Sequence, residues 1–127
     1  MHNLTEAEQL LGLPTIPVHP EAGISPLTLG LSKHEGTPLA IFRGPKLGIK
    51  FGIAYDIDAI REAGEDPNEV LLHELVHALQ YFRDPQNAAR IAREEIDRFG
   101  YDDAPHEVEA RVMARHLKDM VRVWSDD

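Results

Sequence analysis

The fold is decided by residues 66–83, which read DPNEVLLHELVHALQYFR. Asp66 can cap a helix, and Pro67 suits the first helical position because its missing N–H is not needed there. Glu69 follows three residues after the cap, which is capping-box spacing. The residues that follow are mostly apolar. The stretch therefore predicts a helix over about residues 67–83.

An H-E-x-x-H motif lies inside this predicted helix, at residues 73–77. Residues i and i+4 lie one turn apart on the same helical face, so the imidazoles of His73 and His77 can converge on one metal ion. Glu74 points to the side of that pair, where it can take a proton from a metal-bound water without being a ligand. The alternative is a hydrogen-bonded His/Glu cluster, or an exposed helix face, that holds no metal.

The composition limits the possible classes of protein. The chain has 127 residues, a size typical of one domain, and we treat residues 1–127 as a single domain. Hydrophobic residues make up 43% and charged ones 28%, which is ordinary globular usage. Because there is no cysteine, a metal would have to sit on histidine and carboxylate. A soluble enzyme or binding domain is therefore expected.

The net charge and the apolar runs argue against two kinds of partner. The formal net charge is −9, with the acidic excess in residues 51–127, and it repels nucleic acids and anionic membrane surfaces at long range. No apolar run has the length of a membrane span, and the N-terminus does not resemble a signal peptide. We expect no nucleic-acid partner, no membrane and a cytoplasmic location.

The rest of the chain predicts an α+β fold. Residues 1–45 are Pro-rich, with six of nine prolines between positions 14 and 45, and should be mostly irregular. A small helix before these prolines, with Thr5 and Glu8 at capping-box spacing and Gly12 as its end, and a frayed terminus are both open there. Alternation of apolar with small or polar residues predicts a strand at 47–55, and residues 39–43 form a second candidate strand that Gly44-Pro45 would join to it in a hairpin. Helices are expected at 57–63, 85–99 and 105–124. The last would bury a stripe of six residues, namely Ala110, Met113, Leu117, Met120, Val121 and Trp124.

The motif at 73–77 resembles that of the zincin metallopeptidases, whose signature has uncharged residues at the positions of Val70 and Val76. Zincins differ in their third ligand. The later Gly and His of the metzincins are missing from residues 78–84. Residues 105–111, PHEVEAR, resemble instead the gluzincin motif E-x-x-A-D. This resemblance implies that Glu107 is the third metal ligand and that Ala110 lets two helices approach. Glu109 and His106 remain alternatives for the third ligand.

One position departs from the gluzincin pattern. Arg111 stands where the family commonly has an Asp that orients the first metal-binding His. Another group must then orient His73, and the candidates are Asp102, Asp103, Glu109 and a backbone carbonyl.

The resemblance implies a zinc metallopeptidase acting on a peptide or protein substrate. A short antiparallel β-sheet would pack on the active-site helix, and the strand at 47–55, or its neighbour, would pair with an extended substrate. Zn²⁺ would be held by His73, His77 and Glu107, with Glu74 as general base. Five side chains could donate to the oxyanion: Tyr81, Tyr101, His106, Arg111 and His116.

Other interpretations stay open. Some minimal gluzincins are latent, and residues 1–45 or 125–127 could fill the cleft here; the peptidase could also be specific for a single regulator. A catalytically silent metal-binding or regulatory module with the same fold, and a metal-free helical interaction domain, are the rival classes. Four further histidines are expected to be surface residues in preference to metal ligands: His2, His19, His34 and His116.

Overall fold

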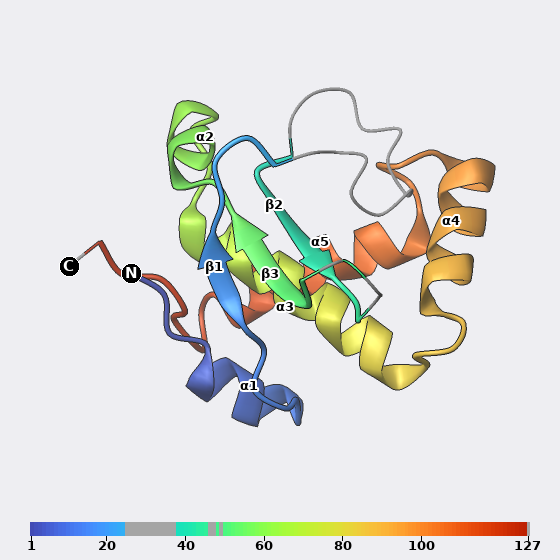
Figure 1. Cartoon of the computed structure of the whole chain (residues 1–127), viewed down its shortest axis with the longest axis horizontal. Coiled ribbons are helices and arrows are strands. Elements are labelled where there is room, and N and C mark those ends of the chain that lie inside the picture. The colour runs from blue at the N-terminus through green and yellow to red at the C-terminus, as the bar shows by residue number, and fades with distance from the viewer. Residues whose placement is uncertain (25–37, 46–47, 49, 127) are drawn as a thin grey trace.

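The computed structural model describes residues 1–24, 38–45, 48 and 50–126. These residues form an α+β fold, as predicted (Figure 1). The elements in chain order are α1 (Thr5–Leu11), β1 (Val18–Pro20), β2 (Ala40–Arg43), β3 (Gly52–Tyr55), α2 (Ile57–Glu62), α3 (Pro67–Arg83), α4 (Ala88–Phe99) and α5 (Pro105–Leu117).

The three strands form a mixed sheet in the order β1-β3-β2. Strand β2 runs antiparallel to β3, as a hairpin would require, but β1 pairs with β3 in parallel, so the prediction of an antiparallel sheet is wrong. Strand β1 lies in the Pro-rich third and has only three residues, which is too short for a period of two to be recognised. Gly52 permits this pairing, since a Cβ there would lie 2.3 Å from the carbonyl oxygen of Pro17.

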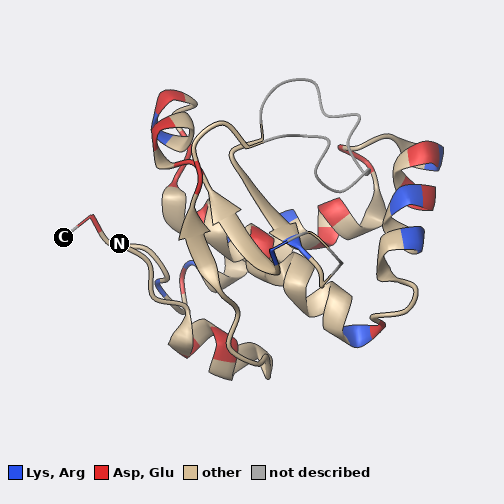
Figure 2. Ribbon diagram, viewed as in Figure 1, with Lys and Arg blue, Asp and Glu red and all other residues tan. Residues whose placement is uncertain are grey.

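Helix α3 packs on one face of the sheet, and α5 packs on α3 (Figure 1). The apolar side of α3 is fully buried and includes Leu71, Leu72, Leu75 and Val76. Charged residues lie mainly on the helices, while the sheet carries few of them (Figure 2). None of the helices in the described part of the chain combines the length and the apolar character needed to cross a bilayer.

Helix α3 has the predicted bounds, and the carboxylate of Asp66 accepts a hydrogen bond from the N–H of Asn68. The helix at the N-terminus is present, but it begins after Leu4 without a side-chain cap, so Thr5 is not the cap residue. Helix α4 begins at Ala88 instead of residue 85, and residues 85–87 form a turn in which the carbonyl of Asp84 accepts hydrogen bonds from the N–H groups of residues 87 and 88. The predicted strand at 47–55 is reduced to β3, and residues 46, 47 and 49 lie outside the described residues.

Helix α5 ends at Leu117, seven residues before the predicted end. Residues 118–120 form a turn, and beyond it Trp124 forms an isolated antiparallel bridge with His2. Val121 and Trp124 are buried as predicted, but Met120 is 64% exposed, so its prediction as a member of the buried stripe is wrong. At residues 123 and 125, backbone hydrogen bonds with the N-terminal residues replace those of a helix. The periodicity of apolar residues cannot predict such contacts between distant segments.

Candidate metal centre

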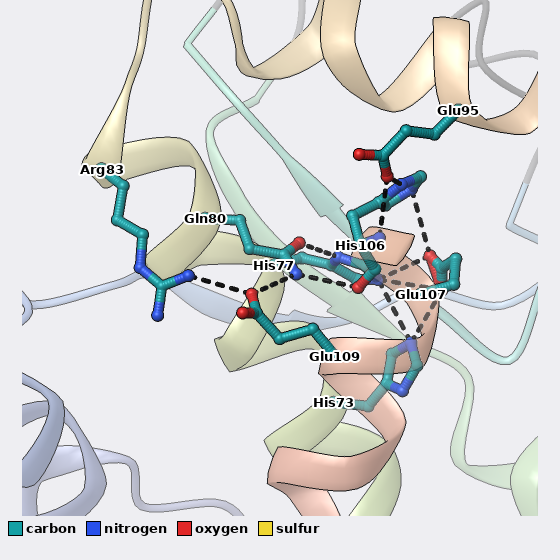
Figure 3. A network of polar contacts seen from close by, with 8 residues as sticks. All are labelled: His73, His77, Gln80, Arg83, Glu95, His106, Glu107 and Glu109. Carbon is teal, nitrogen blue, oxygen red and sulfur yellow. Dashed lines mark hydrogen bonds and ion pairs between the residues drawn. The ribbon is translucent and has the colours of Figure 1, made fainter. Parts of the chain in front are cut away.

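Three side chains from two helices converge at one site (Figure 3). The Nε2 atoms of His73 and His77 lie 3.1 Å apart. The carboxylate of Glu107 lies 3.0 Å from Nε2 of His73 and 2.9 Å from Nε2 of His77. The structure thus brings together the two histidines of the motif and the carboxylate that the E-x-x-A resemblance singles out.

Local structure on each helix accounts for this placement. The two histidines are one turn apart on α3, and Glu107 lies in the first turn of α5, directly after Pro105. Ala110 and Ala114 are buried on the side of α5 that packs on α3, and their small side chains let the two helices lie close together. Glu107 is only 3% exposed, so its carboxylate has to find its partners inside the protein.

The arrangement of these atoms fits a metal ion. Four-coordinate zinc with bonds of about 2.0–2.1 Å separates its ligand atoms by about 3.3 Å, close to the spacings between the two imidazoles and Glu107. Two imidazole nitrogens and a carboxylate oxygen are a ligand set that zinc accepts. His73, Glu74 and His77 also form a group that could hold a metal, with ligand atoms within 4.8 Å of one another. The contacts of Glu107 are shorter, so the geometry favours Glu107 over Glu74 as the third ligand.

The charges of the site favour a cation between the imidazoles. Burial lowers the pKa of His77, but the hydrogen bond to Glu107 and the negative charge of Glu74 outweigh it and raise this pKa to about 9. Burial also works against the ionised form of Glu107, and its hydrogen bonds with His73 and His77 nevertheless hold its pKa well below the ordinary value.

Glu74 is buried beside the imidazole pair. Burial raises the pKa of its carboxyl group, and the positive charges of His77 and His73 oppose that rise. The backbone of Phe42 in β2 also favours the ionised form, which places the sheet next to this carboxylate. A carboxylate with a raised pKa, close to a possible metal site, is suited to moving a proton near neutral pH.

The alternatives for the third ligand have other partners. Glu109 accepts hydrogen bonds from Gln80 and Arg83 at the edge of the site. The Nδ1 atom of His106 lies 2.7 Å from a carboxylate oxygen of Glu95, and its Nε2 lies 3.6 Å from Glu107. His106 is therefore next to the centre, but farther from Glu107 than His73 and His77 are.

Tyr101 and His106 are the two proposed oxyanion donors that interact with Glu107. Burial raises the pKa of the Tyr101 phenol, as do the charges of Glu107 and Glu74 and a hydrogen bond to Glu107. Tyr81 packs against Phe42 and Phe82, and His116 is exposed.

Arg111 donates a hydrogen bond to the carbonyl of Asp102. The polar contacts that the described residues give the His73 ring are those with Glu107 and His77. The candidate orienting groups Asp102, Asp103 and Glu109 are not among them.

Sequence reasoning missed Gln80 and Glu95. Gln80 could have been found from its i+3 spacing to His77 on the same helix, whereas Glu95 reaches His106 from α4 and has no local signal. Of the four remote histidines, His116 is exposed as predicted, and His34 lies outside the described residues.

His2 and His19 are partly exposed and take no part in the candidate metal centre. His2 is partly buried, 3.1 Å from the hydroxyl of Tyr55, and both ring nitrogens of His19 are buried. These two histidines pack where β1 and the chain ends join the sheet, and that packing is not visible in the sequence.

Comparison of the chain with models of protein families, with curated proteins and with solved structures finds no match.

Proposed function

We propose that this protein is a zinc-dependent peptidase of the gluzincin type, with His73, His77 and Glu107 as metal ligands. The observation that carries the proposal is the position of Glu107, whose carboxylate lies 2.9–3.1 Å from the Nε2 atoms of both histidines. Such a buried pocket of one carboxylate and two imidazoles is best satisfied by a divalent cation.

The side chains around this centre have separate roles in peptide hydrolysis. When bound, zinc lowers the pKa of a water molecule and polarises the carbonyl of the substrate. The carboxylate of Glu74 accepts the proton of the attacking water and delivers it to the leaving nitrogen. Tyr101 lies beside Glu107, where its hydroxyl is the candidate donor to the developing oxyanion.

Strand β2 is the element proposed to align the substrate. It stands at the edge of the sheet, and the backbone of Phe42 acts on the Glu74 carboxylate. An extended peptide can add to a sheet edge through backbone hydrogen bonds, which gives affinity for many sequences. We therefore propose a peptide or protein segment in extended conformation as substrate.

The chain termini are held together at another part of the fold. Ser125 and Met1 exchange backbone hydrogen bonds, and the carboxylate of Asp126 accepts hydrogen bonds from Arg61 and Trp124. The contacts of Ser125 and Asp126 support an anchored C-terminus in preference to one that fills the site.

The test separates zinc binding from catalysis. Zinc is measured in protein purified without added metal, and cleavage is followed on a peptide library by mass spectrometry. Glu74→Gln should keep stoichiometric zinc and lose about 10²–10⁴-fold in cleavage rate, since general acid–base catalysis contributes that much. His73→Ala should lose the zinc. Glu69→Gln is the matched control, because Glu69 is on the same helix and lies near Arg115 and Lys118 instead.

Two results would overturn this proposal. Wild-type protein without zinc would remove the metal site and leave the metal-free interaction domain. Zinc-loaded protein in which Glu74→Gln changes neither cleavage nor any other activity would leave the catalytically silent metal-binding module.

A further inference from the structure

Gln80 joins the candidate metal site to the polar edge of helix α5 (Figure 3). It lies on α3, three residues after His77, and its Oε1 atom is 2.8 Å from Nδ1 of that ring. Its Nε2 atom donates to two acceptors, the carbonyl oxygen of His106 at 2.8 Å and a carboxylate oxygen of Glu109 at 2.9 Å. Every polar atom of the Gln80 side chain therefore has a partner.

These partners determine which way the Gln80 amide faces. The carbonyl oxygen of His106 and the carboxylate of Glu109 can only accept hydrogen bonds, so the NH₂ group must point toward them. If the amide were reversed, its oxygen would face two acceptors, which is repulsive in a partly buried site. The oxygen of Gln80 consequently faces His77.

The orientation of the amide determines the tautomer of the ring. An amide oxygen accepts and cannot donate, so Nδ1 of His77 has to carry the proton in this contact. In the neutral ring the other nitrogen, Nε2, then holds a free lone pair. That atom is the one that faces Nε2 of His73 and the carboxylate of Glu107.

We propose that Gln80 is a positioning residue that fixes His77 in the Nδ1–H tautomer and presents its Nε2 lone pair to the metal. This inference rests on the proposed metal site. It assigns to Gln80 the part that a carboxylate or backbone carbonyl usually plays behind a metal-binding histidine. Glu109, an alternative third ligand in the sequence analysis, has a role here, because it accepts a hydrogen bond from the Gln80 amide and another from Arg83 at 3.0 Å.

Gln80 also connects the two helices that supply the ligands. The carbonyl to which it donates belongs to His106, the residue directly before Glu107. One side chain thus contacts a ring on α3 and the backbone adjacent to the carboxylate on α5. Removing the Gln80 side chain should therefore loosen both the His77 ring on α3 and the backbone next to Glu107 on α5.

The variants separate the acceptor from the side-chain volume. Gln80→Leu removes both hydrogen-bonding functions at similar size, whereas Gln80→Glu keeps an acceptor for Nδ1–H but loses the two donated bonds. Gln86→Leu is the matched control, since Gln86 is an exposed glutamine just beyond α3. Zinc affinity of the full chain is measured by competition with a chromogenic chelator at fixed pH.

We expect Gln80→Leu to weaken zinc binding by about 10–100-fold, the usual loss when the partner of a metal-binding histidine is removed. Gln80→Glu should recover only part of that affinity, because its carboxylate still accepts from Nδ1 while its second oxygen faces Glu109 and the His106 carbonyl, and Gln86→Leu should match the wild type. Zinc binding by Gln80→Leu within about twofold of wild type would overturn the proposal.

A second measurement requires no zinc. The tautomer of His77 is read from the ¹⁵N shifts of its ring in metal-free Glu107→Gln protein, above the pH at which the ring loses its charge, because an ionised Glu107 would compete with Gln80 for the ring proton. Protonation at Nδ1 is expected, and protonation at Nε2 would overturn the proposal. If the wild type bound no zinc, the proposed function would fail while this readout still decided the role of Gln80.

Discussion

Asn68 anchors the end of the chain to the helix that carries the metal site. It lies in the first turn of α3 and is only 3% exposed. Its Oδ1 atom accepts two hydrogen bonds, from the N–H of Val123 at 2.7 Å and from the N–H of Trp124 at 3.2 Å. Asn68→Ala would leave both buried N–H groups without this acceptor.

The expected effect follows from these two bonds. A buried donor without a partner costs about 1–3 kcal/mol, and the longer bond contributes less, so we expect a loss of about 2–4 kcal/mol. With an unfolding entropy of about 2.1 cal/mol/K per residue over 127 residues, the melting temperature should fall by about 7–15 °C. Calorimetry measures this shift, and hydrogen exchange should show lost protection at residues 123 and 124.

The control is Asn3→Ala, because Asn3 is exposed and its side chain accepts one hydrogen bond, from Thr5. It should lower stability by less than about 1 kcal/mol. If Asn68→Ala melted within about 2 °C of the wild type and kept the protection of both amides, the reasoning from buried unsatisfied donors would be refuted.

Two further predictions concern the sheet. Gly52→Ala should lower the free energy of unfolding by at least about 2 kcal/mol in urea titration, because the added Cβ would lie 2.3 Å from the Pro17 carbonyl oxygen. Gly64→Ala is the control: Gly64 also has a positive φ but has open space around its Cβ position, so this variant should cost only about 1 kcal/mol. Equal losses in the two variants would contradict the clash at Gly52. The hydrogen bonds from Arg43 lower the pKa of Glu21, so the ion pair stabilises the fold above the ordinary Glu pKa of 4.5 and is lost as the pH falls through the lowered value. The stability difference between wild type and Glu21→Gln should therefore disappear on acidification, and a difference that stayed constant at low pH would argue against this pair.

Several elements were predictable because their signals are local. The bounds of α3 follow from Asp66, Pro67 and the apolar run, and the i, i+4 spacing alone places His73 and His77 together. Strand β3 was recognised by alternation, although the structure shortens it to Gly52–Tyr55.

Other elements depend on contacts between distant segments. Strand β1 exists because residues 18–20 pair with β3, and α5 stops early because its expected last turn joins the N-terminus and Asn68 instead. Neither the pairing of β1 nor the early end of α5 changes the local hydrophobic pattern. The pattern therefore gave no prediction of β1 and predicted too long a helix for α5.

The sequence by itself determined a capped helix that carries two converging imidazoles, because helix geometry repeats every few residues and requires no information from elsewhere. Only the tertiary structure decided which carboxylate meets them. Helix geometry alone does not choose between Glu107 and Glu109, although the resemblance to the gluzincin motif favours Glu107. In the fold, Glu107 is buried, whereas Glu109 contacts Gln80. Glu107 meets the histidines across 30 and 34 residues of chain, and such a contact is fixed only when two helices dock.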